Sequence, residues 1–126
     1  MQRLIEDNFE LKDGDISDEE LFLQSQNHPH MFEKLVDRYS AAFLRKAKVV
    51  MKEEDLARDV VQETFTKIYF KAHQFISQGD GSFKSWGYKI LMNTAFTHYQ
   101  KIYKHKPAQL SEEMEDVLPD LSMIGA

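Results

Sequence analysis

Apolar side chains recur every three or four positions over long segments of this chain, and no segment of useful length alternates apolar with polar residues. A spacing of three and four gathers side chains on one face of an α-helix, whereas a half-buried strand needs a period of two. The spacing is clearest after position 31, in the residues Phe32, Leu35, Val36, Tyr39, Phe43 and Ala47. The pattern predicts an all-α fold, arranged as a compact bundle of about four helices.

Start and stop signals place the first two helices. Ser17 opens the sequence Ser-Asp-Glu-Glu, which is a capping box in which the Glu20 side chain reaches back to the serine. The first helix is therefore expected from Ser17 to about Gln26. The sequence Asn-His-Pro-His at 27–30 breaks this helix, and the second helix follows it.

The third and fourth helices are defined by their apolar residues and by breakers. The third should run from about Glu54 to Phe75, with an apolar stripe made of Ala57, Val61, Phe65, Ile68, Ala72 and Phe75. The fourth should begin at Ser82, a good N-cap, and end near His105 because Pro107 cannot continue a helix. Its expected core residues are Phe83, Ile90, Leu91, Ala95 and Ile102.

The chain of 126 residues is long enough for one hydrophobic core but not for two. We expect a helical domain over 16–106, between an acidic N-terminal tail at 1–15 and an acidic tail or linker at 107–126. The absence of cysteine excludes disulfides and cysteine-ligated zinc, and it fits a reducing compartment. Because the sequence lacks a signal-peptide pattern and a bilayer-length apolar run, we expect a cytoplasmic protein without membrane insertion.

The charge of the chain is unevenly distributed, and this distribution says more than the net value of -5. Residues 1–20 carry eight acidic and two basic side chains, and residues 107–126 carry five acidic and no basic ones. Residues 84–106, in contrast, carry five lysines and no acidic residue. Local charge decides whether a polyanion can bind, so this acidic protein still presents one basic segment that suits nucleic acid.

The sequence contains no convincing catalytic or metal-binding pattern. The acidic stretch 13–18 resembles the start of a calcium loop, but Gln24 stands where that loop needs a bidentate glutamate. His28 and His30 have no third ligand at a suitable spacing. No nucleophile or carboxylate–histidine pattern appears. We therefore expect a protein that is not an enzyme and that uses no cofactor or metal ion.

The third helix carries a polar face opposite its apolar stripe, with the residues Asp59, Gln62, Glu63, Thr66, Phe70 and His73. Most polar helix faces are simply solvated. Phe70 is hard to explain by solvation, and a cluster of acids and amides with an aromatic residue suits a protein partner. Periodicity leaves the two interpretations, a solvated face and a partner surface, about equal.

The fourth helix carries a second strip beside its core face, made of Trp86, Lys89, Asn93, Gln100 and Lys104, with Phe96 and Tyr103 at its edge. Lysines hold phosphates, aromatic rings stack on unpaired bases, and an asparagine amide can read a base edge. Alternatively, the aromatic residues are core anchors and the lysines keep the helix soluble. A single helix aromatic is more often core, and Trp86 lies on the border, but the whole strip without an acid favours nucleic acid.

With both faces described, the chain resembles region 2, the first conserved helical domain, of bacterial extracytoplasmic-function sigma factors in the sigma-70 family. The resemblance covers about 18–106 and is carried by Asp18-Glu19-Glu20-Leu21, Phe32, Arg38-Tyr39, Asp59-Val60-Val61-Gln62-Glu63-Thr64-Phe65, Phe83, Trp86, Tyr88, Ile90 and Asn93. The string at 59–65, followed about twenty residues later by Phe83, Trp86, Tyr88, Ile90 and Asn93, is a specific combination.

The resemblance implies a sigma factor domain that binds core RNA polymerase and recognises and melts the minus-ten promoter element in transcription initiation. The residues implied to dock on the clamp helices of the largest polymerase subunit are Asp59, Gln62, Glu63, Thr66 and Phe70. The residues implied to contact the non-template DNA strand are Phe83, Trp86, Lys89, Asn93, Phe96, Gln100, Lys101 and Lys104. Residues 79–83 would border a pocket for a flipped base, and an anti-sigma factor is a further implied partner.

The chain departs from the family's pattern in two respects. After the asparagine the family commonly has an aspartate and then arginines, where this chain has Thr97, Gln100 and Lys101. The family's second domain, a helix-turn-helix, has no counterpart, so 107–126 is expected to correspond to the inter-domain linker of a truncated protein, with a natural single-domain chain as the alternative. The alternative function is a helical protein-interaction module that binds a regulator without binding DNA.

Overall fold

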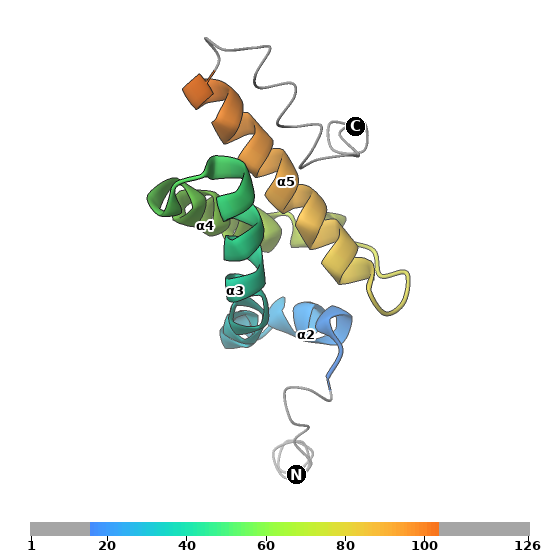
Figure 1. The fold of residues 1–126 in the computed structure, drawn as a ribbon. Helices are drawn as coiled ribbons and strands as arrows, with labels where there is room; N and C mark the ends of the chain where they lie inside the picture. The colour runs from blue at the N-terminus through green and yellow to red at the C-terminus, as the bar shows by residue number, and fades with distance from the viewer. Residues whose placement is uncertain (1–15, 104–126) are drawn as a thin grey trace, which may run out of the picture.

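The computed structural model describes residues 16–103, which form a bundle of four α-helices (Figure 1). The helices are α2 (Asp18–Ser25), α3 (Phe32–Met51), α4 (Glu54–Phe70) and α5 (Ser82–Tyr103), with 3₁₀ turns η2 (Pro29–Met31) and η3 (Ala72–Gln74). No strand occurs within these residues, so the predicted all-α class is confirmed. The two predicted acidic tails and Lys104 lie outside the described residues.

The short helix α2 begins as its capping sequence predicts. Ser17 has an extended backbone, and its Oγ accepts a hydrogen bond of 3.0 Å from the Glu20 amide. The Glu20 carboxylate instead accepts from the Gln24 side-chain amide at 3.0 Å, so its predicted reach back to the serine is replaced by a contact one turn further on. The predicted break after α2 is confirmed, since η2 separates it from α3.

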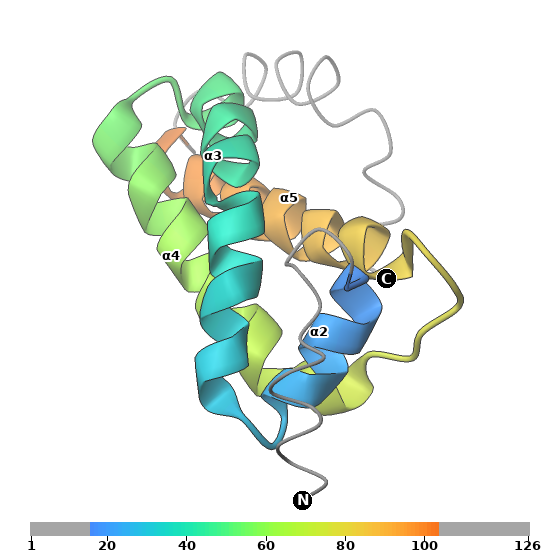
Figure 2. The ribbon, with the colours of Figure 1, turned by 90° about the horizontal axis from the view of Figure 1, so that it is seen from below.

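The long helices α3, α4 and α5 pack against one another, and α2 lies beside α3 and the start of α5 (Figure 2). Lys52 ends α3 in the left-handed conformation with φ of 71°, and its amide donates to the Lys48 carbonyl at 2.9 Å. Since α4 begins only two residues later, at Glu54, this tight turn makes α3 and α4 neighbours. Within the described residues, no helix is both long and apolar enough to cross a bilayer.

Helix α4 is shorter than its sequence predicts, and its buried line is shifted. It ends at Phe70 rather than near Phe75, because the chain turns at Lys71 and continues as η3. The buried residues of α4 are Ala57, Val60, Thr64 and Ile68, whereas the predicted Val61 and Phe65 are half-buried at the edge. The Thr64 hydroxyl donates to the Val60 carbonyl at 2.7 Å, which allows a polar residue to occupy the core.

Most of the residues predicted as the core side of α5 are buried, and further residues of this helix are buried as well. Phe83, Leu91 and Ala95 are buried as expected, while Ile90 is half-buried. Additional buried residues of α5 are Gly87, Met92, Thr94 and Tyr99. The prediction of Ile102 as core is wrong: it is 37% exposed, because it lies in the last turn, where α5 extends past the other helices (Figure 1).

Candidate nucleic-acid and partner interfaces

One side of α5 carries the described members of the predicted DNA strip. Lys89, Asn93, Phe96 and Gln100 follow one another at spacings of four, three and four, so they lie along one side of the helix. Lys89 and Gln100 are exposed, while Asn93 and Phe96 are half-buried. The arrangement places a cation, an amide and an aromatic ring next to one another on a continuous strip. Lys101, also predicted as a DNA contact, is exposed near the end of α5.

The aromatic residues at the start of α5 belong to a cluster that connects α5 with α2. The ring of Phe83 lies 4.9 Å from that of Phe22, and Trp86 lies 5.6 Å from Phe22 and 5.1 Å from Phe75. Phe83 is 1% exposed, which corrects its prediction as a DNA contact: an enclosed core ring cannot stack on a base. Trp86 is half-buried, so this border residue packs its ring mainly into the cluster.

The loop before α5 is held by a serine hydroxyl. The Ser82 Oγ accepts from the Gln78 amide at 3.0 Å and donates to the Gly79 carbonyl at 2.8 Å. Ser82 is therefore the first helical residue and closes the loop, rather than capping the helix as predicted. Gly79 and Gly81 have φ values of 105° and 92°, which glycine adopts without the steric strain of a side chain.

A cleft lies beside this loop. It has a volume of about 450 Å³ and is bordered by α2, the segment around η3, and the loop residues Gly79 and Asp80. Its lining combines the half-buried ring of Phe75 with polar side chains, whereas Phe22 lies beneath it and is only 1% exposed. The volume falls in the range of roughly 300–1,000 Å³ that is common for small-ligand sites. Gly79 and Asp80, in the loop predicted to border a base pocket, therefore border a cleft.

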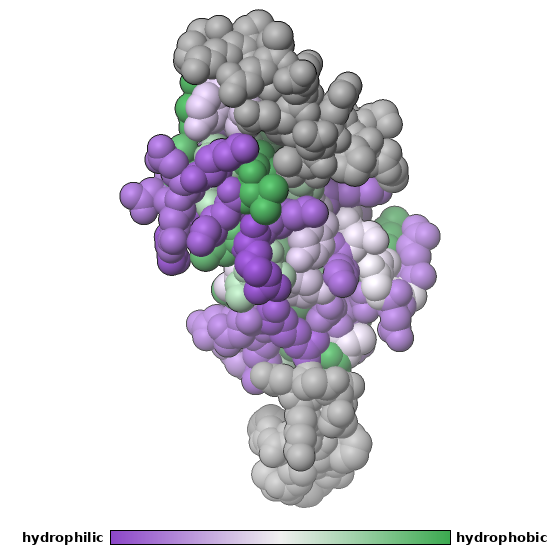
Figure 3. Space-filling model, viewed as in Figure 1, coloured by the Kyte–Doolittle hydropathy of each residue, from purple (hydrophilic) through white to green (hydrophobic). Residues whose placement is uncertain are grey.

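Four of the five residues predicted to face a protein partner are accessible on α4. Asp59, Gln62 and Thr66 are exposed, and the Phe70 side chain is 70% exposed. A groove of about 400 Å³ runs between α3 and α4, and its lining residues are Phe32, Val36, Gln62, Phe65, Thr66, Tyr69 and Phe70. A largely apolar groove beside amide and hydroxyl groups is suited to the side chains of a protein partner. The face of the molecule drawn in Figure 3 is mostly hydrophilic.

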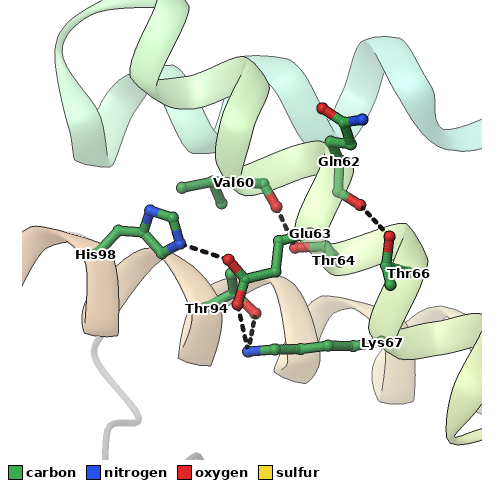
Figure 4. A network of polar contacts seen from close by, with 8 residues as sticks. All are labelled: Val60, Gln62, Glu63, Thr64, Thr66, Lys67, Thr94 and His98. Carbon is green, nitrogen blue, oxygen red and sulfur yellow. Dashed lines mark hydrogen bonds and ion pairs between the residues drawn. The ribbon is translucent and has the colours of Figure 1, made fainter.

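Glu63, the fifth of these residues, instead joins α4 to α5 (Figure 4). Its carboxylate contacts His98 Nε2 at 2.7 Å and Lys67 Nζ at 3.2 Å. The Lys67 ammonium also donates to the Thr94 hydroxyl at 3.0 Å. The hydrogen bond from His98 lowers the pKa of Glu63 below its ordinary value of 4.5, and the hydrogen bond and charge of Lys67 add a smaller effect in the same direction. Desolvation of the carboxylate opposes both effects. The carboxylate is thus already engaged within the domain.

Sequence reasoning also missed a polar contact between α2 and α5. The Glu19 carboxylate of α2 accepts a hydrogen bond from the Phe83 amide at 2.7 Å. The two residues are 64 positions apart, and no periodic pattern links them. The histidines His28 and His30 lie near each other, but no group of three potential metal ligands occurs among residues 16–103.

The chain matches one family model, described as Sigma-70 region 2, over residues 35–104. The match covers more than half of the 126 residues and includes α3 from Leu35 onward and all of α4 and α5. It does not include α2. No curated protein and no solved structure gives a significant match.

Proposed function

The chain belongs to the sigma-70 region 2 family, whose members act in transcription initiation, and from this premise we propose that it belongs to an extracytoplasmic-function sigma factor. In this proposal α4 binds core RNA polymerase, while α5 and its preceding loop capture and help to melt the minus-ten promoter element. Binding alone performs this work, without a catalytic step, in the bacterial cytoplasm where the polymerase operates. An anti-sigma factor would compete for the same surfaces.

The observation that carries the DNA proposal is the continuous side of α5. The exposed Lys89 can contact a phosphate, and the half-buried Asn93 can direct its amide to a base edge. The half-buried Phe96 offers an edge of aromatic surface to an unstacked base. Because α5 carries no acidic residue, nothing on this helix repels the phosphate backbone.

The cleft beside the loop supports the capture of a flipped base. The half-buried Phe75 supplies aromatic surface in it, and Gly79 and Asp80 form part of its rim. Extracting a base costs a few kcal/mol, and stacking on an aromatic side chain returns about 1–3 kcal/mol. Three exposed lysines on α5, Lys84, Lys89 and Lys101, provide too few phosphate contacts for tight binding at physiological salt. Polymerase docking must therefore supply the remaining affinity.

The polymerase proposal rests on the α3–α4 groove and the exposed side of α4. Asp59, Gln62 and Thr66 provide polar groups, and Phe70 adds an exposed ring at the end of the groove. An exposed aromatic residue beside a groove is the kind of anchor that carries much of an interface's binding energy. We assign these four residues to the docking surface, and we assign to the partly exposed Glu63 the role of holding α4 against α5 beside that surface.

The DNA assignment is tested with a complex of this chain and bacterial core RNA polymerase, incubated with randomised single-stranded oligonucleotides. Asn93→Ala should change the selected sequences and weaken the best of them by about tenfold, as loss of a base contact of 1–3 kcal/mol requires. Lys89→Ala should weaken all sequences similarly, since it removes a phosphate contact. Lys46→Ala, an exposed lysine on α3, serves as control. Equal binding by all variants would refute the DNA surface.

The docking assignment is tested by capture of core polymerase on the immobilised chain. Asp59→Ala combined with Gln62→Ala should abolish capture while leaving the helical circular dichroism unchanged, because both side chains are exposed. Arg58→Ala is the matched control, since Arg58 is exposed on the same turn and pairs with Glu54 within α4. Undiminished capture by the double variant would place the docking surface elsewhere.

A further inference from the structure

The N-terminus of α5 is satisfied by a carboxylate from another helix. The first amides of any α-helix lack acceptors within the helix. In α5, the Ser82 and Ser85 amides donate to the loop carbonyls of Gly79 and Gly81, each at 3.1 Å. The Phe83 amide donates to Glu19 at 2.7 Å. A negative charge at this end also interacts favourably with the helix dipole, so Glu19 fixes the first turn of α5 in two ways.

Helix α2 is itself firmly attached, which makes Glu19 an effective anchor. The neighbouring Asp18 carboxylate forms an ion pair with Arg38 of α3 at 2.7 Å and accepts a hydrogen bond from the Tyr39 hydroxyl. One turn further along α2, the Phe22 ring packs on Phe83. Two consecutive acidic residues thus connect α2 to α3 and to α5, and α2 forms a bridge between them (Figure 2).

We propose that Glu19 is a positioning residue for DNA strand capture, an inference that rests on the proposed function. Its carboxylate holds the first turn of α5 and thereby limits the movement of the loop with Gly79 and Gly81, which borders the cleft. If the loop is already ordered before DNA binds, the binding free energy is not reduced by the cost of ordering it.

Amide hydrogen exchange of the whole chain tests the contact independently of any DNA. In Glu19→Ala, exchange at the Phe83 amide should accelerate about tenfold or more, as expected for a lost hydrogen bond to a charged acceptor. Glu19→Gln keeps an oxygen acceptor and should give an intermediate rate. Glu20→Ala removes the adjacent carboxylate, which contacts Gln24, and should leave the Phe83 amide unchanged. Unchanged exchange in Glu19→Ala would overturn the proposal.

The second measurement uses the complex of each variant with core polymerase and a single-stranded oligonucleotide selected by the unaltered protein. Glu19→Ala should weaken strand binding about fivefold or more without reducing polymerase capture, and Glu19→Gln should recover part of the loss. If Glu19→Ala binds normally while Lys89→Ala binds weakly, the positioning role is refuted and the DNA surface stands. If neither variant weakens binding, the DNA surface is refuted and the role of Glu19 in strand capture with it.

Discussion

The Glu63 carboxylate of α4 accepts a hydrogen bond from the His98 ring of α5 at 2.7 Å (Figure 4). Lys67 extends the contact by reaching both Glu63 and Thr94. The helix proposed to bind polymerase is therefore joined by polar contacts to the helix proposed to bind DNA. A displacement of either helix would have to break these contacts or carry the other helix with it.

The Glu63 network predicts a loss of stability in acid. A carboxyl group whose pKa is lowered on folding stabilises the folded state above its unfolded pKa of 4.5, and this contribution disappears as the pH falls through the lower folded value. Glu63→Gln should therefore lower the free energy of unfolding at pH 7. It should also reduce the difference in this free energy between pH 7 and acidic pH. The side chain is 44% exposed, so water screens the pair and the effect should be about 1 kcal/mol or less.

Thermal unfolding followed by circular dichroism between neutral pH and about pH 3 measures this effect. The control is Glu33→Gln, which removes an exposed carboxylate in the first turn of α3, outside the network. A Glu63→Gln protein with the same acid sensitivity as the unaltered chain would show that the network does not contribute to stability.

Phe70 is predicted to matter for polymerase binding and not for folding. Its ring is 70% exposed, so Phe70→Ser should change the free energy of unfolding by less than about 0.5 kcal/mol. The same change should weaken polymerase capture by about tenfold or more, because exposed aromatic anchors dominate interfaces. Val49→Ser is the matched control, a 55% exposed apolar residue on α3. Equal losses of capture in both variants would contradict a specific role for Phe70.

Tyr39 is predicted to ionise at a higher pH than an ordinary tyrosine. Burial, and then the hydrogen bond to Asp18, raise the pKa of Tyr39 above its ordinary value of 10.0. Its contribution to stability is complete below that value and is lost as the pH rises through the higher folded pKa. Phenolate absorbance should show a late-ionising component that Tyr39→Phe removes. A titration curve in which Tyr39→Phe removes only phenolate absorbance that appears near pH 10 would show that the contact does not persist in solution.

Gly87→Ala is predicted to stabilise the domain, although Gly87 is buried in the middle of α5. An added Cβ would lie 3.5 Å from the Phe43 ring and 3.8 Å from Ile68, which are ordinary contact distances. Alanine also favours the helix over glycine by about 0.5–1 kcal/mol. Gly87→Leu should instead destabilise the domain by overpacking, by about 1–3 kcal/mol. Chemical denaturation of the three proteins measures both effects, and a destabilised alanine variant would contradict the packing.

Much of the local structure was predictable because its causes lie within a few residues. The Ser17 cap of α2 and the start of α4 at Glu54 follow from short sequence signals. The end of α4 was missed: the apolar Ala72 and Phe75 continued the helical spacing, but they pack on the core from η3 and the loop. Apolar spacing cannot distinguish one continuous helix from a turn that buries the same side chains.

Helix formation, the all-α class and the exposed sides of α4 and α5 all follow from spacing along the chain, because neighbours three and four apart share a helix face in any fold. Which polar groups meet depends instead on how the helices cross. The contacts Glu19–Phe83 and Glu63–His98 join residues 64 and 35 positions apart, and Phe83 is enclosed because α2 covers it. Packing of separate helices therefore enclosed Phe83 in the core, engaged the partly exposed Glu63 in contacts with α5, and left Lys89 and Phe70 accessible to partners.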